Sequence, residues 1–213
     1  MVLSLEDIVR YSTKCFVNAR GSHDWEHTRR VRNLCRHIGR IEGADPEVLE
    51  IAAYLHDIGR TDEDMFKGAG CHAQKGADMA GTLLEKYPIA DDKRQNIIHC
   101  IRTHRFHGHD RPETLEAKVL FDADKLDAIG AVGIARAYLF AGELGAKLHN
   151  PEVRPEDTAA YTREDTGYRE YRLKLSQIKE RMLTGEGRRM AEQRHRFMEA
   201  FFERFVLEYE GGR

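Results

Sequence analysis

The dipeptide His56–Asp57, at the end of an apolar helical run, constrains this chain more than any other feature. The run from Val48 to Leu55 is nearly all apolar, so a helix there would carry an imidazole and a carboxylate into a partly buried place. Burying an unpaired carboxylate is costly, so a cation, a donor network or a metal must compensate for it. The chain must therefore fold so that other polar groups meet this pair.

Other candidate ligands stand at the edges of apolar helical patterns, at His27, His72, His104 and Asp124. No cysteine belongs to this set, which favours a hydrolytic metal centre over a structural zinc site. Taken alone, His27 is more typical of a hydrogen-bonded core histidine, because backbone groups readily satisfy imidazole nitrogens. Taken together, the side chains come from separate predicted helices, and helical bundles build metal sites in this way.

The composition indicates a soluble protein with a sizeable core. The 213 residues are 41% hydrophobic and 33% charged, and the formal net charge of −2 does not indicate a nucleic-acid-binding surface. The four cysteines are widely spaced without a CxxC motif, which fits a reduced cytoplasmic protein. Charged residues near the N-terminus argue against a signal peptide, and no apolar run is long enough to span a membrane.

Helical periodicity dominates, and no segment shows the alternation of a strand, so we predict an all-α fold. Capping and stop residues set the expected helices. The first three span 4–17, from a cap at Ser22 or Asp24 to near Gly39, and from Asp45–Pro46 to Ile58. The next three run from His72 to a stop at Pro88, from a cap at Asp91, and as one long helix through Leu120 and Ile134. Expected loops are 60–71, 105–113 and 142–166, the last a long surface loop or a hinged flap, before C-terminal helices over about 168–208.

Helix geometry separates the candidates by face. His56 falls in register with Leu49 and Ala52, and Asp57 diverges from it by about 100°. The pair can therefore anchor one ion lying over the gap between them, or Asp57 can bridge two. His104 shares an apolar face with Ile97, whereas His99 lies about 140° away from His104 and is predicted to face solvent or a neighbour.

An acidic cluster within a strong helical pattern is the second notable feature. Asp122, Asp124 and Asp127 fall within six residues, and both Asp122 and Asp124 lie near apolar positions, so periodicity does not choose between them. The alternative is an exposed acidic helix start. Three cations stand near the candidate ligands and could receive a phosphate or simply be exposed: Arg60, Arg105 and Lys125.

Four segments resemble the HD-domain superfamily of metal-dependent phosphohydrolases, in particular a bacterial subgroup of small stand-alone hydrolases. They are SHDWEHTRRV at 22–31, AAYLHDIGR at 52–60, DADKLDAIGAVGIAR at 122–136 and GRRMAEQRHRFMEAFFERF at 187–205. The resemblance implies an HD-domain helical bundle with a C-terminal helical extension. We therefore expect a single HD-type domain over 1–213, with a core at about 20–136 and the helices at 168–208 packed on it.

The resemblance also implies a metal held by His27, His56, Asp57 and one late aspartate, which we assign to Asp124, leaving Asp122 beside the ligands. Binuclear relatives add two histidines at places that His72 and His104 occupy here, so one or two ions per chain are expected. Nitrogen and oxygen ligands of this kind suit Mn, Mg, Fe, Ni and Zn alike.

The expected function is hydrolysis of a nucleotide or another small phosphorylated metabolite by a metal-activated water. Asp57 and Asp124 hold metal and Lys125 stabilises charge on the phosphoryl oxygens, with Asp57, Lys125 and Asp122 expected to be catalytic. Two alternatives stay open: a di-iron HD-type oxygenase, which uses a similar His/Asp set, and a nucleotide-sensing module without turnover.

Overall fold

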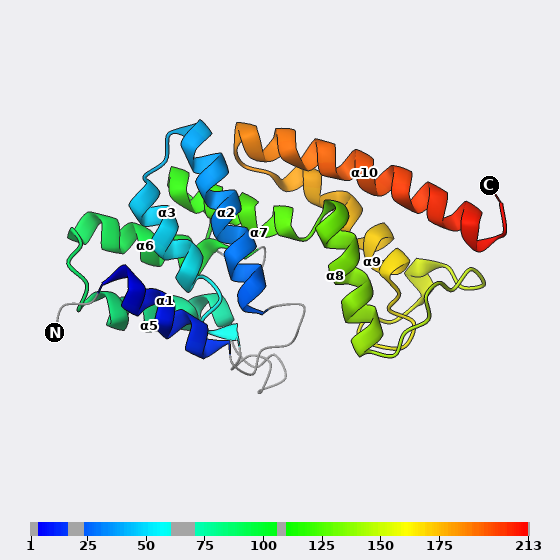
Figure 1. The fold of residues 1–213 in the computed structure, drawn as a ribbon, viewed down its shortest axis with the longest axis horizontal. Helices are drawn as coiled ribbons and strands as arrows, with labels where there is room; N and C mark the ends of the chain where they lie inside the picture. The colour runs from blue at the N-terminus through cyan, green and yellow to red at the C-terminus, as the bar shows by residue number, and fades with distance from the viewer. Residues whose placement is uncertain (1–3, 17–23, 61–70, 106–109, 213) are drawn as a thin grey trace. The chain divides into compact units, whose positions relative to one another are not determined.

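The computed structural model describes residues 4–16, 24–60, 71–105 and 110–212, and within these ranges it contains helices and no strand (Figure 1). The all-α prediction is therefore confirmed. The chain divides into two compact units, Met1–Asp124 and Lys125–Arg213, with α7 running from the first into the second. Each unit is described by itself.

The first unit contains α1 (Leu5–Cys15), α2 (Trp25–Glu42), α3 (Pro46–Leu55), α5 (His72–Leu84), α6 (Asp91–Thr103) and most of α7 (Leu115–Asp127). Helix α3 packs against α1, α2 and α6, and α5 packs against α6. Their apolar faces form the core, in which Ile38, Leu49 and Ile101 are fully buried. Each such side chain stabilises the fold by about 1.5–3 kcal/mol.

The starts of α2 and α3 follow the predicted capping. The side chain of Asp24 accepts the backbone N–H of His27, and Asp45 caps α3 with Pro46 in its first turn. Ser22, the other predicted cap, lies outside the described residues.

Several predicted helix boundaries were wrong. Helix α3 ends at Leu55 and not at Ile58, and His56 is its C-cap. Helix α2 continues through Gly39 to Gly43, which ends it in the left-handed conformation with φ 80°. A Cβ at Gly39 would lie 2.2 Å from Leu49 Cδ1, so this glycine allows α2 and α3 to approach closely and does not end the helix. Asp91 is the first residue of α6 and not its cap, because the N-cap position is taken by Ala90.

The long helix expected through Leu120 and Ile134 is two helices, α7 and α8 (Gly130–Glu143). Gly130 has φ 78°, a conformation that strains any residue with a Cβ, and it breaks the helical path. At Gly133 a Cβ would lie 2.2 Å from the carbonyl oxygen of Ala128, so the second glycine allows the turn to close tightly. Apolar residues continue across the break, so periodicity alone could not reveal it.

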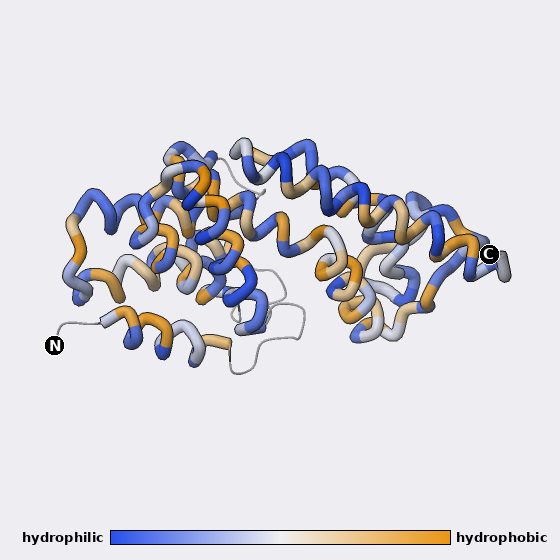
Figure 2. Tube along the Cα trace, turned by 45° about the horizontal axis from the view of Figure 1, so that its top comes forward, coloured by the Kyte–Doolittle hydropathy of each residue, from blue (hydrophilic) through white to orange (hydrophobic). Residues whose placement is uncertain are grey.

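The second unit contains α8, η2 (Pro155–Asp157), α9 (Gly167–Leu173), η3 (Leu175–Arg181) and α10 (Gly185–Tyr209). Hydrophobic and hydrophilic residues recur turn by turn along α10 (Figure 2), which packs on α8 and η3. Its buried side holds an aromatic cluster in which the rings of Tyr171 and Phe202 stack at 4.1 Å. The first of the C-terminal helices predicted over about 168–208 is α9, followed by a 3-10 segment.

The predicted long loop near 142–166 is confirmed, interrupted only by η2, and buried polar bonds hold its last part in place. Asp165 accepts the backbone N–H of Tyr161 at 2.8 Å and pairs with Arg169 at 2.8 Å. Arg169 also donates to the hydroxyl and the carbonyl of Thr158. These bonds favour a fixed structure for this part of the loop over a hinged flap.

The predicted loops at 60–71 and 105–113 fall largely on 61–70 and 106–109, outside the described residues. None of the helices described in the structure has the length and apolar character needed to cross a membrane. The expectation of a single HD-type domain over 1–213 stays a prediction.

Gly59, two residues after Asp57, tests whether the close packing of its backbone against α5 stabilises the first unit. A Cβ there would lie 2.5 Å from the His72 carbonyl oxygen and 2.8 Å from the Gly76 nitrogen. Because backbone atoms cannot move aside cheaply, Gly59→Ala should lower the free energy of unfolding by about 1–3 kcal/mol, measured by urea denaturation.

The matched control is Gly81→Ala, at a helix-interior position where a Cβ would meet only Ile98 Cδ1 at 3.6 Å. This substitution should raise the free energy of unfolding by about 0.5–1 kcal/mol. An unfolding curve for Gly59→Ala that matches the Gly81→Ala curve would contradict the close-approach argument.

Candidate metal centre

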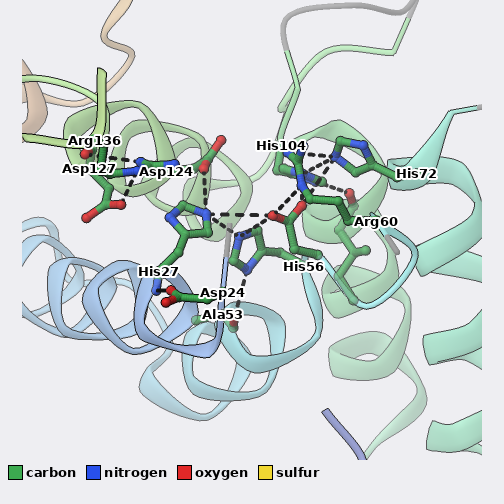
Figure 3. A network of polar contacts seen from close by, with 12 residues as sticks. Asp24, His27, Ala53, His56, Arg60, His72, His104, Asp124, Asp127 and Arg136 are labelled. Carbon is green, nitrogen blue, oxygen red and sulfur yellow. Dashed lines mark hydrogen bonds and ion pairs between the residues drawn. The ribbon is translucent and has the colours of Figure 1, made fainter. Parts of the chain in front are cut away.

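Six buried or half-buried side chains from five helices of the first unit converge on one place (Figure 3). His27 lies in the first turn of α2, His72 is the first residue of α5, and Asp124 lies in α7. His56 and His104 occupy the C-cap positions of α3 and α6, and Asp57 follows His56. Helix ends thus supply most of the centre.

The first of two ligand groups comprises His27, His56 and Asp124. The Nε2 atom of His27 lies 3.3 Å from His56 Nε2 and 3.3 Å from an Asp124 carboxylate oxygen. The three donor atoms all lie within 4.8 Å of one another, which is close enough for one ion to contact them all.

The second group comprises Asp57, His72 and His104, all buried. The Nε2 atoms of His72 and His104 lie 3.3 Å apart, and they lie 3.2 and 3.4 Å from Asp57 Oδ1. These donor atoms also lie within 4.8 Å of one another.

Asp57 joins the two groups. While its Oδ1 belongs to the second group, its Oδ2 lies 3.7 Å from His27 Nε2 and 3.8 Å from His56 Nε2, in the first. One carboxylate therefore has an oxygen toward each group, the placement that a bridging ligand needs.

The hydrogen bonding of Asp57 supports a cation between the two ligand groups. Asp57 Oδ1 is buried, and the described residues give it no hydrogen bond of acceptable geometry, although two imidazole nitrogens lie within 3.4 Å. A buried carboxylate oxygen without a partner is costly. The close approach of atoms that are not aligned as donor and acceptor is what ligands of a shared ion show, so these residues fit a divalent metal.

Two imidazoles are oriented in the same way by their own helices. His56 Nδ1 lies 2.8 Å from the Ala53 carbonyl, and His104 Nδ1 lies 2.6 Å from the Ile101 carbonyl. A carbonyl oxygen only accepts, so each Nδ1 carries the proton and each Nε2 presents a lone pair to the centre. Hydrogen bonds of this kind typically fix metal-binding histidines.

The charge states also suit metal binding. Burial lowers the pKa of His56 to about 4 and lowers that of His104, so both imidazoles are neutral at pH 7. Burial alone would raise the pKa of Asp57, but the Arg60 guanidinium holds it well below its usual range. The centre therefore offers neutral nitrogens and an ionised carboxylate.

Arg60 has a contact that the sequence did not reveal. Its Nε donates to Asp57 Oδ2 at 2.9 Å, and its side chain keeps 23% of its surface exposed. The sequence suggested Arg60 as a phosphate receiver and not as a partner of Asp57. The only sequence signal for this pair is its three-residue spacing, which is too common to be specific.

The remaining candidates lie as follows. Asp124, and not Asp122, has its carboxylate in a ligand group; Asp122 is fully buried two residues earlier. His99 lies outside both groups, and its Nε2 accepts the backbone N–H of Glu113 at 3.0 Å. Lys125 and Arg105 are half-buried.

The chain is similar to known proteins in both sequence and fold. A family model described as HD domain matches residues 24–129. The protein YpgQ of Bacillus subtilis is 32% identical over 200 residues, which are 92% of this chain and 89% of YpgQ. The crystal structure of YpgQ in complex with ADP aligns with a TM-score of 0.74 at 30% identity, covering 96% of this chain and 97% of that one.

Two further relatives differ in how much of their length is shared. The crystal structure of a predicted HD superfamily hydrolase from an uncultured Thermotogales bacterium aligns with a TM-score of 0.70 at 30% identity, covering 96% of this chain and 92% of that one. Ribonuclease Y of Alkaliphilus metalliredigens is 33% identical over 108 residues, which are 51% of this chain and only 20% of the ribonuclease.

The buried neutral state of His56 predicts how metal-free protein responds to acid. Its pKa is about 4 in the folded chain and 6.5 ordinarily, so the unfolded chain takes up the proton first as the pH falls. The stability that His56 contributes is fully present above pH 6.5 and declines as the pH falls to 4. Urea unfolding should show this part as about 3 kcal/mol.

His56→Gln is the comparison for that measurement, because glutamine does not titrate. The difference in unfolding free energy between the two proteins should change across pH 6.5 to 4 and stay constant above it. Parallel pH profiles for the two proteins would show that His56 is not buried in the neutral form.

Proposed function

The chain belongs to the HD-domain superfamily, and on that premise we propose that it hydrolyses a phosphoric ester or anhydride bond in a nucleotide or another small phosphorylated metabolite. The superfamily comprises metal-dependent phosphohydrolases, and two solved relatives with full-length similarity are described as HD-superfamily hydrolases. The YpgQ structure contains ADP, which supports a nucleotide as the first substrate to test.

The observation that carries the proposal is the joining of two ligand groups by the Asp57 carboxylate. We assign one ion to His27, His56, Asp57 and Asp124, and a second ion to Asp57, His72 and His104. Divalent ions bound there would activate a water and polarise a phosphoryl oxygen. Neutral imidazoles suit this chemistry because they leave an ion strongly electrophilic.

The chain's own cations have separate proposed roles. Arg60 pairs with Asp57 and is partly exposed, and its positive charge is proposed to attract a phosphoryl oxygen beside the ligands. Lys125 follows Asp124 on α7 and is proposed to stabilise negative charge on the substrate. Asp122, buried on α7 two residues before Asp124, is proposed to support that residue without contacting an ion.

Asp57→Ala is the decisive variant, since it removes the ligand common to both groups. It should abolish retention of divalent metal and lower phosphate release by more than about 100-fold, a loss that even the partners of metal ligands can cause. Metal content measured by mass spectrometry, with Mn²⁺-supported phosphate release from nucleotides and sugar phosphates, tests this. Helical content measured by circular dichroism should stay close to that of the wild type.

His99→Ala is the matched control, because His99 is a helical histidine in the same unit that lies outside both groups. It should keep both metal and activity. Loss of metal in His99→Ala but not in Asp57→Ala would overturn the ligand assignment. Oxygen consumption by iron-loaded protein without phosphate release would favour the oxygenase alternative, and nucleotide binding without phosphate release would favour a sensor.

The number of ions has its own test in His104→Ala. This change removes one of only three ligands of the second group and leaves the first group complete. If wild-type protein holds about two ions per chain, the variant should hold about one, counted by calorimetric titration with Mn²⁺. Equal ion counts in the variant and a two-ion wild type would contradict the assignment of His104.

A further inference from the structure

Helix α7 carries the proposed ligand Asp124 and ends one turn later, at Asp127. The last carbonyl groups of a helix have no partners within it, and so they need capping from elsewhere. Here two arginines provide it. Arg136 of α8 donates to the Asp127 carbonyl at 3.2 Å, and Arg194 of α10 donates to the Leu126 carbonyl.

The same arrangement holds the Asp127 side chain. Arg136 Nη1 donates to Asp127 Oδ2 at 2.7 Å, and the carboxylate is buried. Arg194 is mostly buried and lies close to the same negative charge, with its side chain against Gly130, where a Cβ would lie 3.0 Å from Arg194 Cγ. The absence of a Cβ at Gly130 thus makes room for the aliphatic part of the Arg194 side chain.

A clamp of this kind is more than a surface ion pair. A cation at a helix C-terminus stabilises the last turn by charge as well as by hydrogen bonding. Breaking a buried pair leaves an uncompensated charge, which costs several kcal/mol. The last turn of α7 is therefore held at both its backbone and its side chain.

We propose that Arg136 is a positioning residue for metal binding: by clamping Asp127, it fixes the final turn of α7 and so the place of the Asp124 carboxylate three residues earlier. Asp124 lies on the same side of the helix as Asp127, because residues three apart are neighbours on a helix. Metal ligands must be held to within about 0.5 Å of their productive positions. The inference rests on the proposed ligand role of Asp124.

Arg136→Gln tests the proposal through the affinity for Mn²⁺, measured by calorimetric titration of the intact chain. The variant should bind Mn²⁺ about 10–100-fold more weakly, the loss typical when a group that orients a ligand is removed. Arg136→Lys should recover most of the affinity, because one nitrogen, Nη1, makes both contacts to Asp127. Loss of the clamp without loss of affinity would overturn the proposal.

Arg169→Gln is the matched control. Arg169 also lies in the second unit, is similarly buried and pairs with a buried aspartate, Asp165, at 2.8 Å, but that pair holds a loop and not α7. This variant should lower the melting temperature and leave Mn²⁺ affinity within about twofold of wild type. An equal loss of affinity in Arg169→Gln would reduce the role of Arg136 to general stability.

Asp127→Asn provides a milder variant if Arg136→Gln does not fold. It keeps the size of the side chain and an accepting oxygen but removes the charge, so a smaller weakening of Mn²⁺ binding is expected; unchanged affinity would count against the clamp. A wild-type protein that binds no Mn²⁺ would instead refute the proposed function. The two failures are therefore distinguishable.

Discussion

The buried carboxylate of Asp57 is the interaction on which the rest of the site depends. It is 1% exposed, so its charge must be compensated inside the protein. Arg60 supplies one contact on Oδ2, but Oδ1 lies among imidazole nitrogens without a hydrogen bond of acceptable geometry from the described residues. A cation bound between the two ligand groups would give Oδ1 the partner that neutral imidazoles do not. The helices of the first unit are placed accordingly, with four of them presenting their ends, or a turn next to an end, to this one group.

Much of the fold could be predicted from the sequence because helix faces and caps are local properties. Asp45 and Pro46 start α3 as expected, since a capping carboxylate and a fixed φ act within one turn. The break between α7 and α8 could not be predicted in the same way. Apolar residues continue across it, and at the break Arg194 of α10 packs against Gly130, which has a left-handed conformation. That contact joins segments more than sixty residues apart, and periodicity does not report such contacts.

The candidate site likewise has features that local helix geometry predicts and features that depend on the assembled fold. His104 could be separated from His99 by helical angle, and the structure places only His104 among the ligand groups. Asp122 and Asp124 could not be separated by angle, because both faces of α7 are apolar; the distance from Asp124 to His27 Nε2 distinguishes them. A bridging position for Asp57 was one of two geometric options that the sequence left open for an adjacent pair. The position of Asp57 depends on where α5 and α6 place His72 and His104, which is a property of the assembled unit.

One device recurs at the centre and explains how helix C-termini supply two of its four imidazoles. His56 and His104 each cap a helix, and each donates Nδ1–H to the carbonyl three residues earlier. A carbonyl in the last turn of a helix lacks a partner within the helix, and an imidazole ligand needs its second nitrogen fixed. A single hydrogen bond meets both needs, so the ligand's orientation is set by its own helix and not by a separate residue. At the end of α7, the arginines that cap the helix likewise have a second proposed role, because they hold the turn that carries the proposed ligand Asp124.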